Sequence, residues 1–178
     1  AGVIHRDVKP SNILIGNPKS EIRNPKWEVK LTDFGIGQVV SAEYLAGITR
    51  LGFTETMLSP GSSSQTGTHL YMAPELSAGQ PASACSDIYS LGVVLYQLLV
   101  GDLTRPLTTD WARRIADPLL REDLEKCFAG DPQERFAEAG QLARNLRALG
   151  ERRADLAQRE RAAARGRLVR RTTVAFAL

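Results

Sequence analysis

The apolar run at residues 86–100 constrains the fold more than any other feature of the sequence, because its hydrophobic side chains face nearly every side of a helix. A surface helix would carry a polar stripe at helical spacing, so this run predicts a buried central helix. Gly101 follows it, and glycine commonly ends helices in the left-handed conformation. The run is too short to cross a bilayer, which takes about 20 residues. Other elements must therefore pack around this helix.

Two short segments before this run read as strands. Residues 13–15 and 28–32 are bounded by polar residues, and the stretch between them contains Pro18 and Pro25, which suits a hairpin-like loop. Trp27 adjoins that loop, and we expect it to pack rather than to bind a ligand. The sequence therefore predicts a small β-hairpin ahead of the helices.

Further helices are expected after the central one. Asp117 precedes Pro118, which is the pattern of an N-cap and a first-turn proline, and this helix should run towards Gly130. Another helix should start near Ala137, with Leu142, Leu146 and Leu149 on one stripe. Together with the hairpin, these segments predict a mainly α fold with a small β-hairpin.

Positive charge is concentrated near the end of the chain. Residues 144–171 contain ten arginines and three acids, whereas the rest of the chain carries a net charge of −4. A nucleic-acid-binding domain would be basic over its folded body, so the charge distribution argues against that class. Two cysteines, Cys85 and Cys127, are too few for a zinc cluster or a disulfide scaffold, which fits a reducing compartment.

Three motifs occur in a fixed order: HRDVKPSN at residues 5–12, DFG at 33–35 and GTHLYMAPE at 67–75. In this order they resemble the catalytic domain of eukaryotic-type (Hanks-type) Ser/Thr protein kinases, of the bacterial receptor-like kind. The resemblance covers about residues 1–149 and corresponds to the C-terminal lobe. It implies that the N-terminal lobe, with its glycine-rich loop and ATP-contacting lysine, lies upstream and is missing from this fragment.

The resemblance implies a site for phosphate transfer from ATP to a protein substrate. Asp7 would accept the proton of the substrate hydroxyl, and Lys9 would place a positive charge near the transferring phosphate. Asn12 and Asp33 would offer oxygen ligands to Mg²⁺, which prefers such donors. Thr68 matches the threonine whose hydroxyl bonds the catalytic aspartate and lysine. The fragment alone is expected to be inactive, and a non-catalytic kinase-like module that binds partners is the alternative.

Other matching residues are expected to hold the site together. Glu75 and Arg135 match a buried ion pair of the family, for which the bidentate guanidinium is suited. His5 matches a packed, hydrogen-bonded histidine. Asp87 is open to two interpretations that are compatible: an N-cap of the central helix, or a side chain that holds the backbone of the catalytic loop.

Regulation is expected through the long segment from Asp33 to Glu75. In the family, an arginine at the position of Arg6 receives a phosphate from this segment, which orders it. The favoured acceptors lie shortly before Thr68 and are Ser62, Ser63, Ser64 and Thr66. A serine-rich loop without modification is the alternative.

The arginine-rich segment at residues 150–178 is treated as a separate helix or linker. Arg170 and Arg171 directly precede an uncharged run, which is the pattern of the cytoplasmic flank of a membrane span that continues beyond Leu178. A solvated helix and a nucleic-acid arm are the alternatives, and we expect no nucleic-acid partner. The protein is expected in the cytoplasm, at the cytoplasmic face of the inner membrane if the span exists.

Overall fold

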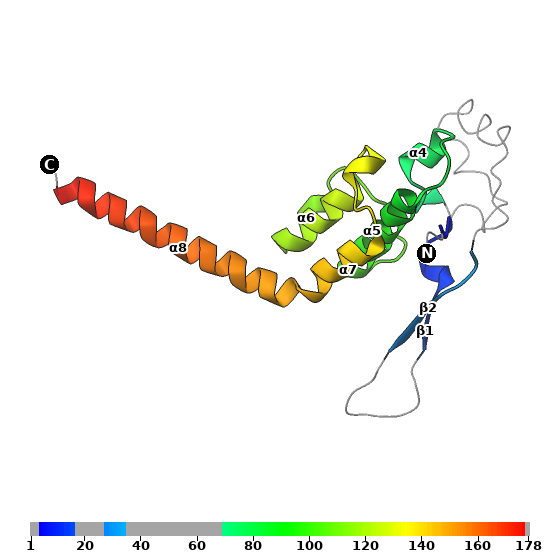
Figure 1. Cartoon of the computed structure of the whole chain (residues 1–178), viewed down its shortest axis with the longest axis horizontal. Coiled ribbons are helices and arrows are strands. Elements are labelled where there is room, and N and C mark those ends of the chain that lie inside the picture. The colour runs from blue at the N-terminus through cyan, green and yellow to red at the C-terminus, as the bar shows by residue number, and fades with distance from the viewer. Residues whose placement is uncertain (1–3, 17–26, 35–68, 177–178) are drawn as a thin grey trace.

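The computed structural model describes residues 4–16, 27–34 and 69–176, without the side chains of 166 and 168–176. Within these ranges the chain forms a helical body, a two-stranded antiparallel hairpin and one long projecting helix (Figure 1). The predicted mainly α fold with a small hairpin is therefore confirmed. The elements are β1 (Ile13–Gly16), β2 (Glu28–Leu31), α4 (Pro74–Ser77), α5 (Ala84–Val100), α6 (Pro118–Cys127), α7 (Ala139–Arg147) and α8 (Leu149–Phe176), with the short 3-10 turns η1 (Pro10–Asn12), η3 (Trp111–Arg114) and η4 (Pro132–Glu134).

The hairpin forms from the two segments that the sequence predicts as strands. Its register pairs Ile13 with Leu31 and Ile15 with Val29, which puts these side chains on one face of the ribbon. Trp27 is 61% exposed, so the expectation that it packs is wrong. The physical reason is size, because a ribbon of two short strands offers too little surface to bury a large side chain.

Helix α5 is the centre of the body, and its ends have clear causes. Ser83 and Ser86 form a capping box at the start, and Gly101 ends the helix with a left-handed φ of 77°. The prediction of burial on every side fails in the last turn, where Leu98 is 61% and Leu99 41% exposed. Among the apolar residues of that turn, Val100 packs against the core, and Leu98 and Leu99 do not, because neighbouring side chains on a helix point in different directions.

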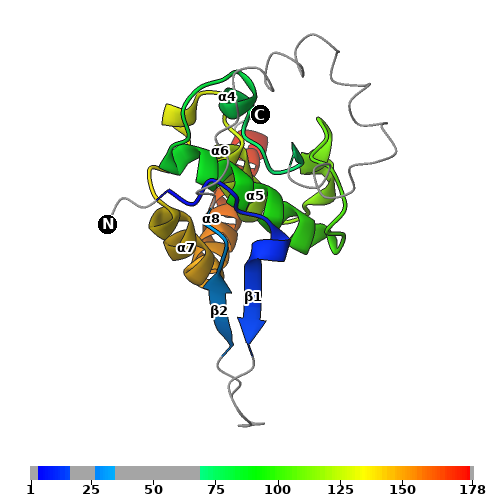
Figure 2. The ribbon, with the colours of Figure 1, turned by 90° about the vertical axis from the view of Figure 1, so that its right-hand side faces the viewer.

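Helices α5 and α6 approach each other closely. A side chain at Gly92 would place its Cβ 2.6 Å from Cys127 Cβ, so only glycine fits there. As predicted, α6 starts after Asp117, whose carboxylate accepts from the backbone N–H groups of Leu119 and Leu120. It ends at Cys127, short of Gly130. Figure 2 shows α5 crossing the body in front of α6, above the hairpin.

The last predicted stripe is divided between two helices. Leu142 and Leu146 lie on α7, which ends at Arg147, whereas Leu149 begins α8. Leu146 and Leu149 both pack against the same core cluster, so the predicted apolar stripe faces the core even though two helices share it. Helix α8 then runs away from the body (Figure 1). Among the described residues, no helix combines the length and apolarity needed to cross a membrane.

Candidate active site

The HRD segment is held in an unusual backbone conformation by one carboxylate. Arg6 has a φ of 70° and Asp33 a φ of 55°, both in the left-handed region that non-glycine residues rarely adopt. Asp87 accepts hydrogen bonds from the backbone N–H of His5 at 2.6 Å and of Arg6 at 2.9 Å. Residues in such conformations persist where surrounding contacts over-determine them, and they cluster at functional sites. Ser83 is the N-cap of α5, so the N-cap interpretation of Asp87 is wrong.

His5 is buried and uses both of its ring nitrogens. Its Nε2 lies 3.0 Å from the carbonyl oxygen of Thr32, and its Nδ1 lies 3.3 Å from the backbone N–H of Asp7. A carbonyl can only accept and an amide can only donate, so we assign the proton to Nε2. The ring centroid also lies 4.6 Å from that of Phe34. This histidine therefore joins the HRD and DFG segments and is not free to act as a base.

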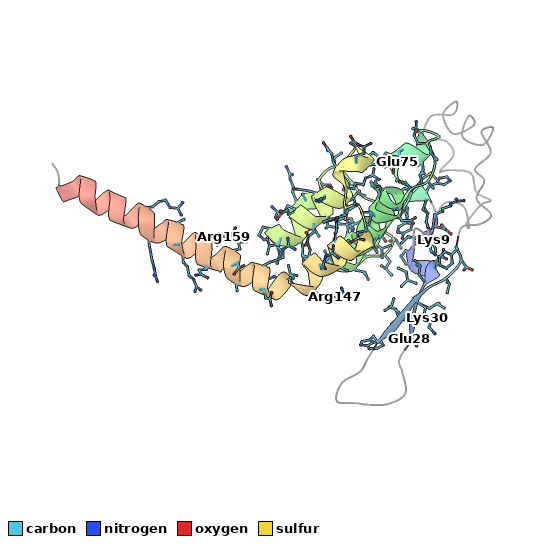
Figure 3. All side chains as sticks on the ribbon, viewed as in Figure 1. Lys9, Glu28, Lys30, Glu75, Arg147 and Arg159 are labelled. Carbon is cyan, nitrogen blue, oxygen red and sulfur yellow. The ribbon has the colours of Figure 1, made fainter. Side chains whose placement is uncertain are left out.

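Lys9 and Asn12 both contact one carboxylate oxygen of Asp7. Asp7 Oδ2 lies 2.8 Å from Lys9 Nζ and accepts from Asn12 Nδ2 at 3.0 Å. Asn12 is 4% exposed, and its Nδ2 also donates to the backbone oxygen of Asp7 at 2.8 Å. Lys9, labelled in Figure 3, lies where the chain enters the hairpin. The Asp7 carboxylate is thus oriented by a cation and an amide, and its side chain is 13% exposed.

Asn12 and Asp33 are brought to the same place by the hairpin. Thr32 donates from both its backbone N–H, at 2.9 Å, and its Oγ1, at 3.3 Å, to the backbone oxygen of Asn12. Asp33 directly follows Thr32 and is exposed. Asn12 Nδ2 donates to Asp7, and its amide oxygen Oδ1 accepts a hydrogen bond from Ser11 Oγ at 3.4 Å, so a ligand of Oδ1 would replace or share that contact. Mg²⁺ commonly takes one or two such protein oxygens and completes its shell with phosphates and water, so these residues fit that ion.

Arg135 and Glu75 form a bidentate ion pair inside the body. Arg135 NH1 and NH2 donate to the two carboxylate oxygens of Glu75 at 2.7 and 2.8 Å, and the Arg135 side chain is fully buried. The same guanidinium donates to the carbonyl oxygens of Ala129 at 2.9 Å and Cys85 at 3.0 Å. Glu75 lies at α4 (Figure 3), so one side chain joins α4, the start of α5 and the segment after α6.

A polar network that sequence reasoning missed fixes the segment before α4. Tyr71 donates from its hydroxyl to Gln97 Oε1 at 2.8 Å, and Ser90 Oγ donates to the backbone oxygen of Tyr71 at 2.6 Å. Burial raises the pKa of Tyr71, against the lowering effect of its hydrogen bond to Gln97. Ser86, Ser90 and Gln97 are the buried polar residues of α5. Their spacing places them near one face of an otherwise apolar helix, and this was the available signal.

Several expected site residues lie outside the described residues. They are Thr68 and the candidate phosphate acceptors Ser62, Ser63, Ser64 and Thr66. The side chain of Arg6 is described and exposed. The structure therefore brings together Asp7, Lys9 and Asn12, and the positions of Thr68 and the acceptors stay predictions.

Two of the three motifs thus lie against each other, held by α5. This arrangement agrees with comparison to known proteins: the family model of the protein kinase domain matches residues 1–168. The chain belongs to the protein kinase family.

Similar proteins are bacterial Ser/Thr kinases. The serine/threonine-protein kinase PknA of Mycobacterium tuberculosis is 36% identical over 158 residues, which cover 80% of this chain and 31% of that protein. The serine/threonine-protein kinase pkn3 of Myxococcus xanthus is 37% identical over 156 residues, covering 87% of this chain and 25% of pkn3. The chain spans about a third or less of the length of these relatives.

Proposed function

We propose that this chain supplies the C-terminal lobe of a Ser/Thr protein kinase that transfers the terminal phosphate of ATP to Ser or Thr hydroxyls of a protein substrate. The observation that carries the proposal is the Asp7 carboxylate, which is oriented on one oxygen by Lys9 and Asn12. Phosphoryl transfer depends on positioning and on charge neutralisation more than on covalent chemistry. A carboxylate held in this way is suited to aim a substrate hydroxyl.

Each residue of the site has a distinct role in this mechanism. Asp7 binds the substrate hydroxyl through its other carboxylate oxygen, Oδ1, and accepts the proton as the hydroxyl attacks. Lys9 stays next to Asp7 and balances negative charge, with Thr68 as a further hydroxyl partner. Asn12 and Asp33 would hold Mg²⁺, which supplies neutralisation of the phosphate charge when ATP is bound.

Other parts of the proposal concern control and location. Arg6 has an exposed side chain on a backbone that Asp87 fixes, so it is suited to bind a phosphate on Ser62, Ser63, Ser64 or Thr66. Phosphate transfer further needs the nucleotide-binding lobe of the family, so the 178-residue chain alone should not transfer phosphate. A cytoplasmic location fits, because ATP is the phosphate donor.

The test is Asp7→Asn in a kinase that carries this segment together with the nucleotide-binding lobe. Phosphate transfer should fall by about two orders of magnitude or more, while ATP binding changes little, because the general base acts on the chemical step. Asp110→Asn is the matched control, because Asp110 is exposed and lies before η3, away from the motifs. Unchanged transfer in Asp7→Asn would remove the role of Asp7, and no transfer by the unmutated kinase would favour a partner-binding module.

A further inference from the structure

The base of α8 is bound to the body by a carboxylate that the active site does not use. Asp123 on α6 is 2% exposed, and it accepts hydrogen bonds from Arg152 NH1 at 2.6 Å and from Asn145 Nδ2 at 2.7 Å. Arg152 NH1 also lies 3.3 Å from the backbone oxygen of Asn145, so one guanidinium joins α8 to both α6 and α7. Release of α8 would leave the buried Asp123 with one hydrogen-bond partner, Asn145, in the described part of the chain.

Cys127 lies near both this carboxylate and the buried Arg135. It follows Asp123 by one turn of α6 and is 0% exposed. Burial raises the pKa of its thiol, Asp123 raises it further and Arg135 lowers it, so both charges are close. A Cβ placed on Gly92 of α5 would lie 2.6 Å from Cys127 Cβ, which leaves no spare room between the two helices. Because close-packed contacts transmit strain, a shift of α6 at Asp123 should reach Arg135.

Arg135 carries the connection onwards to α4. Its Nε donates at 2.9 Å to the carbonyl oxygen of Ala129, which follows the end of α6, and its other two nitrogens hold the Glu75 carboxylate. None of the four described residues of α4 is buried, and in the described part of the chain Glu75 makes the side-chain hydrogen bonds that join α4 to the body (Figure 3). Since α4 begins shortly after Thr68, its position fixes one end of the segment that carries this residue.

We propose that α8 regulates the substrate site through a coupling between its docking on α6 and the hold of Arg135 on α4. While Arg152 binds Asp123, α6 keeps the position in which the Ala129 carbonyl and Glu75 share Arg135. When α8 is displaced, α6 relaxes and α4 loosens. Coupling between two sites is reciprocal, so loosening of α4 must also loosen the base of α8. The effect on phosphate transfer rests on the proposed function, whereas the coupling itself is measured without it.

Hydrogen exchange of the 178-residue chain tests the coupling at α4. The backbone N–H groups of Leu76 and Ala78 are hydrogen-bonded in and beside this helix, so their exchange reports its loosening. Arg152→Gln should speed their exchange by about fivefold or more, which is the lower end of the usual range for coupled sites. The matched control is Arg153→Gln, which removes the neighbouring arginine, whose side chain is 55% exposed, and should leave the exchange nearly unchanged.

The reverse experiment starts from the ion pair at α4. The backbone N–H of Arg152 donates to the Ala148 oxygen at 2.9 Å in the first turn of α8, so its exchange reports the base of that helix. Glu75→Gln should speed this exchange by a factor similar to that of the first experiment. In the double variant, Arg152→Gln should have no further effect on α4, because the contact through which α8 acts is already broken.

Low concentrations of urea separate this coupling from a general loss of stability. Urea speeds exchange that needs global unfolding, whereas local opening exposes little surface and is nearly insensitive to it. Four results would overturn the proposal: α4 exchange that is unchanged in Arg152→Gln, that rises equally in Arg153→Gln, that becomes urea-dependent, or that rises as much again in the double variant. If Arg152→Gln does not fold, Asp123→Asn replaces it, because it removes the ion pair without leaving a buried charge.

A complete kinase tests the regulatory consequence. Arg152→Gln should raise the KM for a peptide substrate by about fivefold and leave the KM for ATP unchanged, because α4 lies beside the segment that carries Thr68 and not beside Asn12 and Asp33. A change in both constants, or in neither, would contradict regulation through α4. An unmutated kinase that transfers no phosphate would remove the proposed function and leave the exchange results standing, so the two failures are distinct.

Discussion

Two buried arginine–carboxylate clusters hold this molecule together, and they bury opposite charges. In the first, the cation is hidden: the side chain of Arg135 is 0% exposed and that of Glu75 is 11% exposed. In the second, the anion is hidden: the side chain of Asp123 is 2% exposed and that of Arg152 is 22% exposed. The more deeply buried charge is therefore the cation in the first cluster and the anion in the second.

The difference follows from what each cluster joins. Arg135 donates four hydrogen bonds within the body, two to Glu75 and two to backbone carbonyls. Because these partners surround the guanidinium on three segments, its side chain is fully buried. Asp123 is enclosed by α6 and α7, whereas Arg152 comes from the partly exposed first turn of α8. A buried charge without a partner costs several kcal/mol, so removing either arginine is costly through what it leaves behind: Glu75 and two backbone carbonyls in the first cluster, and Asp123 in the second.

The largest effect is expected at the first cluster. Arg135→Ala should lower the free energy of unfolding by about 3–5 kcal/mol, because it strands Glu75 and two backbone carbonyls. Urea unfolding of the unchanged chain and the variant measures the loss. Adding Glu75→Gln to Arg135→Ala should recover part of it, since no carboxylate is then left unpaired. Strictly additive losses in the two single variants and the double variant would contradict a direct interaction.

A smaller loss is expected at the second cluster. Arg152→Ala should cost about 2–3 kcal/mol, because Asp123 keeps its hydrogen bond from Asn145 and is only partly stranded. The neighbouring Arg153→Ala is the matched control: its side chain is 55% exposed, and such pairs contribute up to about 1 kcal/mol. Equal losses in both variants would mean that burial of Asp123 does not set the cost.

The first cluster could be predicted from the sequence, whereas the second could not. Glu75 and Arg135 belong to patterns that resemble a known family, and the side chains expected to pair lie together in the structure. Asp123 lies three residues after Leu120 and four before Cys127, so helical spacing places it on the buried face of α6, but nothing in the sequence pattern shows which residues pair with it. Its burial depends on how α7 and α8 return to α6. The pairing of Asp123 with α7 and α8 is a long-range property, and local sequence spacing does not predict it.

The same distinction explains the fold predictions. Elements with strong local causes were placed well: the hairpin strands, the capped start of α6 and the glycine end of α5. Exposed Trp27 and the exposed Leu98 were missed, because burial depends on which surfaces meet and not on the hydrophobicity of one side chain. The site positions of Thr68 and the phosphate acceptors stay predictions, since they lie outside the described residues.

Cys127 lies close enough to both clusters for their charges to affect the pKa of its thiol. Burial raises the pKa of its thiol from 9.0 to about 12, with a further raising effect of Asp123 and an opposing effect of Arg135. The folded protein therefore keeps a proton that the unfolded chain loses above pH 9. Stability from this thiol is complete below pH 9 and is lost as the pH rises towards 12. At pH 10.5 the loss amounts to about 2 kcal/mol relative to pH 8.

Urea unfolding at pH 8 and pH 10.5 tests this titration. The free energy of unfolding should fall more steeply with pH in the unchanged chain than in Cys127→Ala, which has no thiol to titrate at that position. Cys85→Ala is the matched control, because it removes the other thiol of the chain and leaves Cys127 in place. The same pH dependence in Cys127→Ala and the unchanged chain would contradict a proton retained at Cys127.

The smallest expected change in stability compares two buried tyrosines, one whose hydroxyl has a hydrogen-bond partner and one whose hydroxyl has none in the described part of the chain. Tyr71 donates to Gln97, whereas the buried hydroxyl of Tyr96 has no hydrogen-bond partner in the described part of the chain. Tyr71→Phe should cost about 1 kcal/mol, because it leaves Gln97 Oε1 without its donor inside the body, while Gln97 Nε2 keeps its hydrogen bond to the Arg105 carbonyl. Tyr96→Phe removes a hydroxyl that gains nothing from its surroundings, so it should be neutral or stabilising by up to about 1 kcal/mol. Thermal melts of the two variants compare the same chemical change in both settings, and equal destabilisation would show that the Tyr96 hydroxyl has a partner after all.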